Sequence, residues 1–282
     1  MQYTQSSGAF ALFGLVAGLL FSLAATAQEL PAVPDAIKKQ GVVRIGIKCD
    51  YPPDGYLDNA GKPQGIEVSL AKQLAVYAFG SADKAELTCV TAANRIPSLQ
   101  GGKIDAIIAT LGISDERRQV IDFSEKYAWG ASEVVVPENS PVKKLADLGG
   151  KTVVVLKGAW QIAWFEKNLP NANLLKLDSV SDALQALMQG RADGYAHDLA
   201  VLQELAKKNK KVKLVGDLYQ IGYRGVGLRK DEPQWAAFVN AAIAKANKDG
   251  LVAKWVKDYV EADTQDIVLN MWSLDKVPTT TN

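Results

Sequence analysis

The pattern of apolar and polar positions predicts alternating strands and helices in the first half of this 282-residue chain. Residues 42–47, 86–90 and 104–109 are predicted to be strands, and the apolar run 104–108 indicates that the third is buried. Between them, residues 66–77 carry apolar side chains at helical spacing, and residues 96–100 form a short helix that ends before two glycines. A β-α-β-α-β order predicts a parallel, doubly wound sheet. The intervening Pro-, Gly- and Asp-rich stretch, 51–65, is expected to be a loop.

The same pattern restarts in the second half of the chain. Strands are predicted at 150–156, 174–177 and 191–196, with helices around 160–165 and at 181–189. A weak internal repeat supports two similar lobes, because residues 99–106 align without gaps to residues 187–194. In each copy a helix ends at Gly, a basic residue follows, and an aspartate, Asp105 or Asp193, enters a strand. For both aspartates we expect a structural role at the strand edge. Two ordinary helix-to-strand turns with the same chemistry are the alternative.

Two extended stretches, 126–136 and 221–228, connect the halves, and amphipathic helices follow at 235–247 and 251–259. Two crossings allow the last part of the chain to return to the first lobe. The predicted fold is therefore α/β, with two doubly wound lobes joined by two hinge strands and a ligand cleft between them. Lobe 1 is expected to comprise residues 28–131 and 226–282, and lobe 2 residues 132–225.

Composition places the chain among globular proteins, with 48% hydrophobic and 22% charged residues. A formal net charge of +1 gives no reason to expect a nucleic-acid partner. Residues 8–27 are uncharged and end in small residues, which predicts a cleaved signal peptide over residues 1–27 and a periplasmic protein. No Lys or Arg precedes this stretch, which departs from the signal pattern, and a membrane anchor is the alternative.

Export makes the two cysteines informative. Cys49 and Cys89 lie near the ends of predicted strands, so a disulfide is expected if those strands are neighbours, and two buried thiols are the alternative. The single histidine, His197, is expected at a strand end and not as a base. Since no cluster of residues has metal-ligand spacing, neither a metal nor a cofactor is expected.

The turn at residues 109–117 carries the first candidate chemistry. It follows a predicted buried strand, and Ser114 can cap a short helix that begins after it. The turn combines free backbone N–H groups, the Thr110 hydroxyl and the Arg117 guanidinium, a set suited to holding a carboxylate. The alternative is a capped surface helix whose Arg117 lies in water.

From about Val42 to Tyr259 the sequence resembles the periplasmic solute-binding proteins of bacterial ABC transporters, specifically the polar amino-acid-binding family. The order and spacing of many short stretches carry this resemblance: residues 44–47, 51–53, 65–72, 95–99, 102–106, 113–118, 122–124, 147–151, 184–193 and 249–251. The resemblance implies the type II periplasmic-binding-protein fold. It also implies a monomer, not an enzyme, that captures an amino acid and delivers it to a membrane permease.

The resemblance also implies how the head group of an amino acid is held. Arg117, helped by Thr110, Gly112 and the turn that starts at Ala109, binds the carboxylate. Asp198 falls where the family keeps the acid that accepts the ligand's ammonium group, and an N-cap of the helix after it is the alternative. On lobe 2 the ligand loop is residues 158–161, which include Trp160 and Gln161; many relatives carry Ser or Thr there, and Ala159 and Trp160 lack those hydroxyls.

Side-chain recognition is expected to depend on two cations. Lys48 stands where the glutamate- and aspartate-binding members have Arg, and the stretch around Arg95 resembles the same members. An acidic ligand is therefore one expectation and another polar amino acid the other. In the alternative, Asp54 neutralises Lys48 and Arg95 forms a surface salt bridge. Asp54 also replaces a Phe common in the family. Tyr51 and Trp129 are then the candidates for an aromatic wall, although core packing is the commoner role of such residues.

Two further functions compete with transport. Cyclohexadienyl dehydratases resemble this family, and Glu133, Asp54 and Asp198 are the acids that can be placed near the cleft, but none lies in a recognisable catalytic motif. A sensor that presents its closed form to a receptor is the other possibility. The stretch after Asp263 has no clear family match, and Trp272 within it is expected to pack against lobe 1.

Overall fold

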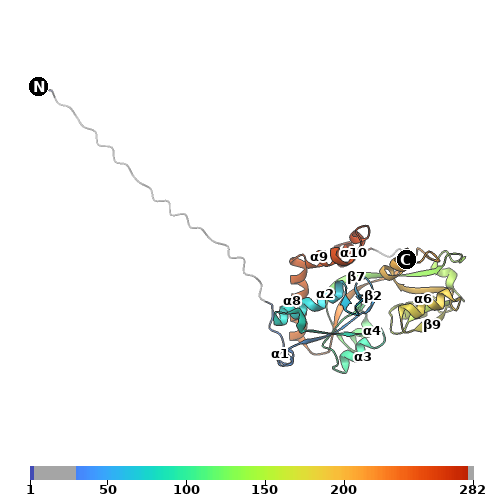
Figure 1. Ribbon diagram of the computed structural model, residues 1–282, viewed down its shortest axis with the longest axis horizontal. Helices are drawn as coiled ribbons and strands as arrows, with labels where there is room; N and C mark the ends of the chain where they lie inside the picture. The colour runs from blue at the N-terminus through green and yellow to red at the C-terminus, as the bar shows by residue number, and fades with distance from the viewer. Residues whose placement is uncertain (3–29, 279–282) are drawn as a thin grey trace.

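A nine-stranded mixed sheet runs through the molecule, in the order β5-β1-β6-β12-β7-β10-β8-β9, with β11 also pairing with β7. The computed structural model describes residues 1–2 and 30–278, so most of the predicted signal peptide lies outside the described residues (Figure 1). The strands are β1 (Val43–Ile47), β5 (Ala85–Cys89), β6 (Ala106–Ile108), β7 (Asp122–Pro137), β8 (Thr152–Leu156), β9 (Asn173–Leu177), β10 (Gly194–Asp198), β11 (Val212–Leu214) and β12 (Tyr219–Leu228).

The strand directions divide the sheet into two parallel halves joined by two long antiparallel strands. β1 pairs in parallel with β5 and β6, and β8 pairs in parallel with β9 and β10. Between these halves β7 and β12 pair antiparallel over most of their length. In Figure 1, α6 and β9 lie toward one end of the folded part of the molecule and α1 and α8 toward the other. The predicted fold class, two doubly wound lobes joined by two hinge strands, is confirmed.

Helices cover the sheet. They are α1 (Asp35–Gln40), α2 (Ile66–Phe79), α3 (Arg95–Gln100), α4 (Asp115–Arg118), α5 (Gln161–Asn168), α6 (Val180–Met188), α7 (Leu199–Lys208), α8 (Pro233–Lys248), α9 (Leu251–Tyr259) and α10 (Gln265–Trp272). Short 3-10 turns occur at η1 (Ala82–Lys84), η2 (Leu145–Leu148) and η3 (Leu274–Lys276). Among residues 30–278, no helix has both the length and the apolar character needed to span a membrane.

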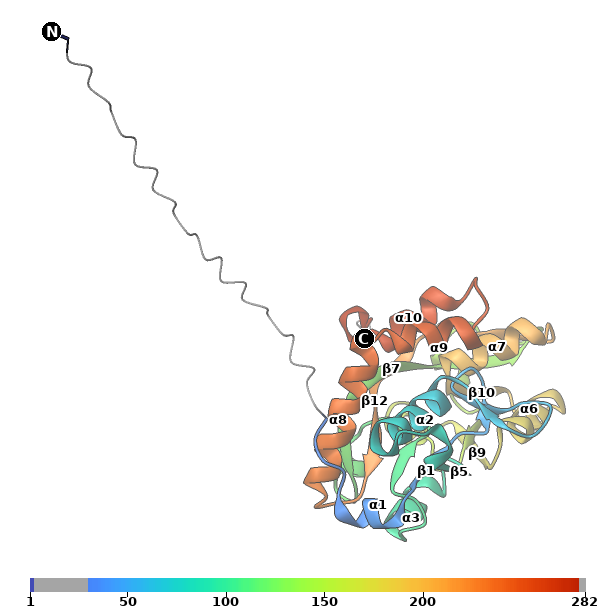
Figure 2. The same cartoon turned by 60° about the vertical axis from the view of Figure 1, so that its left-hand side comes forward.

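Strand β8 shows why the second lobe is doubly wound. Successive side chains of a strand point to opposite faces of the sheet. Val154 packs in one buried cluster with Leu187 of α6, whereas Val153 packs in another with Phe165 of α5. Both faces are therefore covered by helices, which explains the continuous apolar run in the sequence. The first lobe is built in the same way: Ile108 of β6 packs in one cluster with α2 and α8 (Figure 2), whereas Ile107 packs in another with Leu99 of α3.

The internal repeat in the sequence corresponds to a repeated set of hydrogen bonds. The Asp105 backbone N–H donates to the Arg44 carbonyl at 2.7 Å, and the Asp105 carboxylate accepts the Arg44 backbone N–H at 3.1 Å. Asp193 makes the equivalent pair of bonds with Thr152, at 2.8 and 2.9 Å. Both aspartates thus join the entry of one parallel strand to the start of its neighbour, the structural role that was expected.

Two segments differ from the sequence expectations, and a third, after Asp263, forms an element that the sequence analysis did not predict. The predicted loop 51–65 contains a small sheet of β2 (Asp50–Tyr51), β3 (Gly55–Leu57) and β4 (Pro63–Gln64). Such strands are too short to show a period in the sequence. Likewise β10 begins three residues later than predicted and continues to Asp198, because pairing with β8 starts only at Gly194. After Asp263 the chain forms α10, and its Trp272 packs against Tyr127 of β7, as expected for contact with lobe 1.

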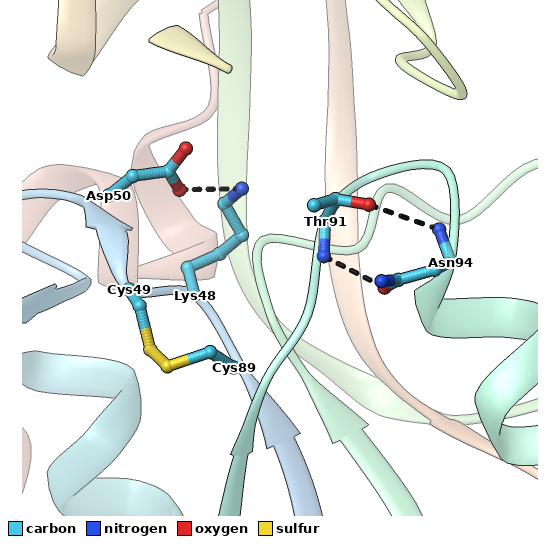
Figure 3. Close-up of a disulfide and its surroundings, with 6 residues drawn as sticks. All are labelled: Lys48, Cys49, Asp50, Cys89, Thr91 and Asn94. Carbon is cyan, nitrogen blue, oxygen red and sulfur yellow. Dashed lines mark hydrogen bonds and ion pairs between the residues drawn. A yellow bond between two sulfur atoms is a disulfide. The ribbon is translucent and has the colours of Figure 1, made fainter. Parts of the chain in front are cut away.

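A disulfide joins Cys49 and Cys89, with Cα atoms 5.5 Å apart. β1 and β5 are neighbours and pair Ile47 with Cys89, which places both cysteines at the same end of the sheet. Figure 3 shows Cys49 between Lys48 and Asp50, and Cys89 just before the turn closed by Thr91 and Asn94. The disulfide therefore links two segments that lead directly into the candidate site.

Replacing both cysteines, in Cys49→Ser/Cys89→Ser, should lower the free energy of unfolding by about 2–4 kcal/mol, because the unfolded chain loses a cross-link. The cross-link spans 40 residues. Urea unfolding monitored by tryptophan fluorescence measures the change, and wild type unfolded under reducing conditions is the control. Equal unfolding midpoints for variant and wild type would show that the bond contributes nothing to stability.

Candidate ligand-binding site

A cavity of about 30 Å³ lies between the two lobes. Its walls come from the ends of strands, from the turn before α4 and from the loop before α5. The lining residues are Lys48, Tyr51, Ala92, Arg95, Thr110, Gly112, Arg117, Leu156, Ala159, Trp160, Gln161, His197 and Asp198. Most of the residues predicted from the sequence are therefore brought together at one place.

Arg117 points from α4 into this cavity. The Ser114 hydroxyl caps the helix by accepting the Arg117 backbone N–H at 3.3 Å, as predicted. The guanidinium donates to the carbonyl of Gly112 at 2.7 Å and to that of Gly158, on the opposite lobe, at 3.1 Å. Burial lowers the pKa of Arg117, although the group remains a cation at neutral pH. The alternative of an arginine projecting into water does not hold.

The backbone turn at Thr110 is held by two buried charges of opposite sign. Thr110 has a positive φ of 49°, which is uncommon for a residue with a Cβ atom. Its N–H donates to the Glu67 carboxylate at 2.8 Å. On the other side, the Arg95 guanidinium donates to the carbonyls of Ala109 at 2.5 Å and of Thr110 at 3.3 Å. These contacts account for a backbone conformation that would otherwise be strained.

Gly112 allows lobe 2 to close tightly over this turn. A Cβ atom at Gly112 would lie 2.9 Å from the indole of Trp160, closer than such atoms approach in proteins. Among the described residues no oxygen accepts the Gly112 N–H, which leaves that donor free at the cavity wall. The turn therefore offers a free N–H beside the Arg117 guanidinium, the arrangement expected for binding a carboxylate.

The Asp198 carboxylate faces the same cavity and is surrounded by donors. Oδ2 accepts the Tyr51 hydroxyl at 2.5 Å and the Arg224 guanidinium at 3.2 Å, while Oδ1 accepts Trp160 Nε1 at 3.0 Å and Gln161 Nε2 at 2.7 Å. Burial raises its pKa, but Arg224 and the other donors outweigh burial and hold the pKa below its ordinary value. Asp198 occupies the N-cap position of α7, yet its side chain makes no capping bond.

Arg224, on hinge strand β12, is the main site residue that the sequence reasoning missed. Its guanidinium forms a buried ion pair with Asp54 at 2.8 Å and a second with Asp198 at 3.2 Å. Asp54 is therefore the partner of Arg224 and not of Lys48, which pairs with Asp50 at 2.7 Å (Figure 3). The one signal in the sequence was Asp54, a charge in place of a family aromatic.

Glu67 lies behind this ion pair and has no solvent exposure. It accepts the Tyr127 hydroxyl at 2.5 Å and lies 3.9 Å from the Arg224 guanidinium. Burial, together with the nearby charge of Asp54, raises the pKa of Glu67 to about 7. The Thr110 turn thus depends on a carboxyl group that changes its charge near neutral pH.

Arg95 is 4% exposed, which excludes the surface salt bridge offered as its alternative. Burial and the charge of Arg117 lower the pKa of Arg95 to about 9. Within the described part of the chain neither arginine forms a salt bridge; each donates only to carbonyls at the positions given above. Two cations of the site therefore lack a carboxylate partner.

Three predicted site residues do not line the cavity. Ala109 contributes its carbonyl to Arg95, and Asp54 pairs with Arg224. Trp129 packs in the core, where its indole donates to the Asn270 carbonyl at 2.6 Å. Tyr51 and Trp160 supply the aromatic surface of the cavity instead.

His197 and Glu133 are both buried, in different surroundings. His197 lines the cavity, and its Nδ1 accepts the Asp198 backbone N–H at 2.7 Å, while burial lowers its pKa to about 4. The imidazole is therefore neutral at neutral pH. Glu133 does not line the cavity and accepts the backbone N–H groups of Val134 and Gly216 at 2.7 and 3.2 Å.

Across residues 30–278, no three His, Cys, Asp or Glu side chains converge as a metal site requires.

Replacing Glu67 by Gln should change how stability depends on pH. From pH 4.5 to about pH 7 the folded protein keeps a proton on Glu67 that the unfolded chain releases. Stability therefore falls as pH rises through this range, and Glu67→Gln should show a shallower decline. Urea unfolding at several pH values measures it, with the exposed variant Glu86→Gln as control. Parallel curves for wild type and Glu67→Gln would contradict the assigned shift.

Comparison with known proteins agrees with this geometry. The family of bacterial extracellular solute-binding proteins, family 3, matches residues 43–262. The glutamine-binding protein of an ABC transporter from Bacillus subtilis is 32% identical over 229 residues, covering 79% of this chain and 84% of that protein. The L-cystine-binding protein of Escherichia coli is 31% identical over 252 residues, covering 88% and 92%.

Among solved structures, the solute receptor for L-cysteine of Neisseria gonorrhoeae matches with a TM-score of 0.80 and 35% identity. The match covers 86% of this chain and 98% of that chain, so the similarity includes both lobes and the hinge. The architecture, the cavity between the lobes and the family match lead to one identification. The chain belongs to family 3 of the bacterial extracellular solute-binding proteins.

Proposed function

We propose that this protein captures a polar α-amino acid outside the cytoplasm and delivers it to the membrane permease of an ABC transporter. The observation that carries the proposal is that a cation, Arg117, and an anion, Asp198, both line one cavity between the two lobes. A zwitterionic head group presents a carboxylate and an ammonium group on one carbon, which suits a cation and an anion on opposite walls. Names of the relatives, which refer to glutamine, cystine and cysteine, support the same class of ligand.

In this proposal the carboxylate binds Arg117, the free Gly112 N–H and the Thr110 hydroxyl, and the ammonium group binds Asp198. Closure of the lobes completes the site, because Arg117 bonds to Gly158 of the opposite lobe and Trp160 covers Gly112. A ligand that contacts both lobes stabilises the closed form over the open one. The closed form is then the species that the permease recognises.

The charges around the cavity favour a ligand side chain with an acidic tip. Lys48, Arg95 and the neutral imidazole of His197 line it, and Arg95 has no carboxylate partner among the described residues. These charges agree with the expectation of glutamate or aspartate. Aspartate and glutamate both carry such a tip, and cysteine, the ligand named for a similar solved structure, carries a weakly acidic thiol. The relatives do not point specifically to acidic ligands, so the charges of the cavity alone carry this finer assignment.

The proposal includes the boundaries of the two lobes, the oligomeric state and the export of the protein. We place lobe 1 at residues 28–131 and 226–282 and lobe 2 at residues 132–225, since β7 and β12 pair Ser132 with Tyr219 and Lys126 with Gly225 where they cross. We also propose a monomer exported by a signal peptide over residues 1–27. Transport is favoured over catalysis because the relatives are binding proteins and Glu133 is held by backbone N–H groups away from the cavity.

Arg117→Ala should weaken binding of the amino-acid ligand by about 3 kcal/mol, roughly a hundredfold, because it removes a buried partner of the carboxylate. A thermal-shift panel of amino acids, followed by calorimetric titration of the best one, measures the effect. The exposed neighbour on the same helix provides the matched control Arg118→Ala, which should bind like wild type. Unchanged affinity in Arg117→Ala would refute the assigned carboxylate site.

Lys48→Met tests the side-chain assignment, because methionine keeps the apolar stem and removes the charge. We expect aspartate and cysteine to bind about tenfold more weakly, while serine and alanine are unaffected, since they carry no acidic tip. Calorimetric titration of the four amino acids makes the comparison. If glutamine or arginine gives the largest thermal shift in wild type, the acidic-tip assignment is wrong.

A further inference from the structure

Arg224 connects both lobes behind the carboxylate that faces the cavity. It belongs to β12, one of the two strands that cross between the lobes. Its Nη1 bonds to Asp54, in the segment after β2 of lobe 1, at 2.8 Å. Its Nη2 bonds to Asp198, at the end of β10 in lobe 2, at 3.2 Å, and lies 3.3 Å from the Tyr51 hydroxyl. Arg224 is 4% exposed and is not among the residues that line the cavity.

We infer that Arg224 is a positioning residue for recognition of the ligand's ammonium group: it clamps Asp198 to Asp54 and so holds the lobe 2 carboxylate against the cavity. The inference rests on the proposed function. Arg224 acts through Asp198 and does not touch the ligand. The same clamp ties ammonium recognition to lobe closure, because its two carboxylates come from different lobes.

The charge balance supports this role. A carboxylate as buried as Asp198 favours the protonated form unless a cation lies beside it, and a protonated acid attracts an ammonium group only weakly. Arg224 provides that cation, yet it shares one positive charge between two ion-paired carboxylates, with Glu67 at 3.9 Å as a third. The cluster therefore keeps negative charge that an ammonium group can neutralise.

The other groups around Asp198 do not replace Arg224. Tyr51, Trp160 and Gln161 donate hydrogen bonds without charge. The His197 imidazole carries no charge at neutral pH either, because its pKa is lowered to about 4. Arg95 and Arg117 line the same cavity, but within the described part of the chain they donate hydrogen bonds to backbone carbonyls. Among the described residues, Arg224 is thus the cation that forms a salt bridge with Asp198.

The test compares an amino acid with the analogue that lacks its ammonium group. The probe pairs are L-cysteine with 3-mercaptopropionate and L-aspartate with succinate, each titrated calorimetrically into wild type, Arg224→Lys and Arg224→Gln. We expect wild type to prefer the amino acid by at least a hundredfold and Arg224→Gln to lose at least tenfold of that preference. Arg224→Lys, which keeps the charge, should retain the preference within about threefold.

Arg224→Gln alone leaves Asp54 buried without its partner, which can unfold the protein. The double variant Asp54→Asn/Arg224→Gln removes both charges of the pair and should show the same loss of preference. If both probes of a pair weaken equally in these variants, so that the preference is unchanged, Arg224 is only structural and the inference is overturned.

Asp198→Asn separates this inference from the proposed function. A loss of preference in Asp198→Asn together with an unchanged preference in the Arg224 variants overturns the clamp alone. An unchanged preference in Asp198→Asn means that the ammonium group is not bound there, which overturns the clamp and the ammonium assignment together. If wild type binds neither the amino acids of the thermal-shift panel nor these probes, amino-acid capture itself fails.

Discussion

The buried carboxylate of Asp198 accepts hydrogen bonds from side chains of both lobes, and the rest of the site is arranged around it. An anion removed from water must be surrounded by donors or by a counterion. Here the donors come from both lobes and from a hinge strand: Tyr51 from β2, Arg224 from β12, and Trp160 with Gln161 from the start of α5. Satisfying this one charge requires the elements that carry those side chains to converge, and their convergence forms the cavity.

The opposite wall shows the same use of buried charge to shape a polar surface. Glu67 and Arg95 bind the backbone of the Thr110 turn from opposite sides. The turn held in this way presents the Gly112 N–H beside Arg117. A site prepared in this way needs little reorganisation when an anion arrives, because its dipoles are already aligned. Burying Glu67 costs stability near neutral pH, as its raised pKa indicates, and we interpret that cost as the consequence of preparing the turn.

Local chemistry explains which site residues could be predicted. The turn at 109–117 follows a buried strand and precedes a Ser-capped helix, so Thr110, Gly112 and Arg117 share one place on any doubly wound sheet. The family resemblance, and not local chemistry, placed Trp160 and Gln161 on the ligand loop, at the start of α5. Local reasoning could not find the pair of Arg224 and Asp54, which lie 170 residues apart. It also gave Trp129 a place in the cavity wall, whereas α10, unmatched by the family, takes up its indole.

The sequence by itself determined the order of the elements, the two lobes and the positions of the main site residues, because hydrophobic period, turn residues and caps act over a few neighbouring positions. Only the tertiary structure decided which charge neutralises which. Lys48 pairs with Asp50, and Arg224 bridges Asp54 and Asp198, while Arg95 and Arg117 are left to backbone carbonyls. The physical reason is that ion pairing depends on distance and burial in space, which separation along the chain does not encode.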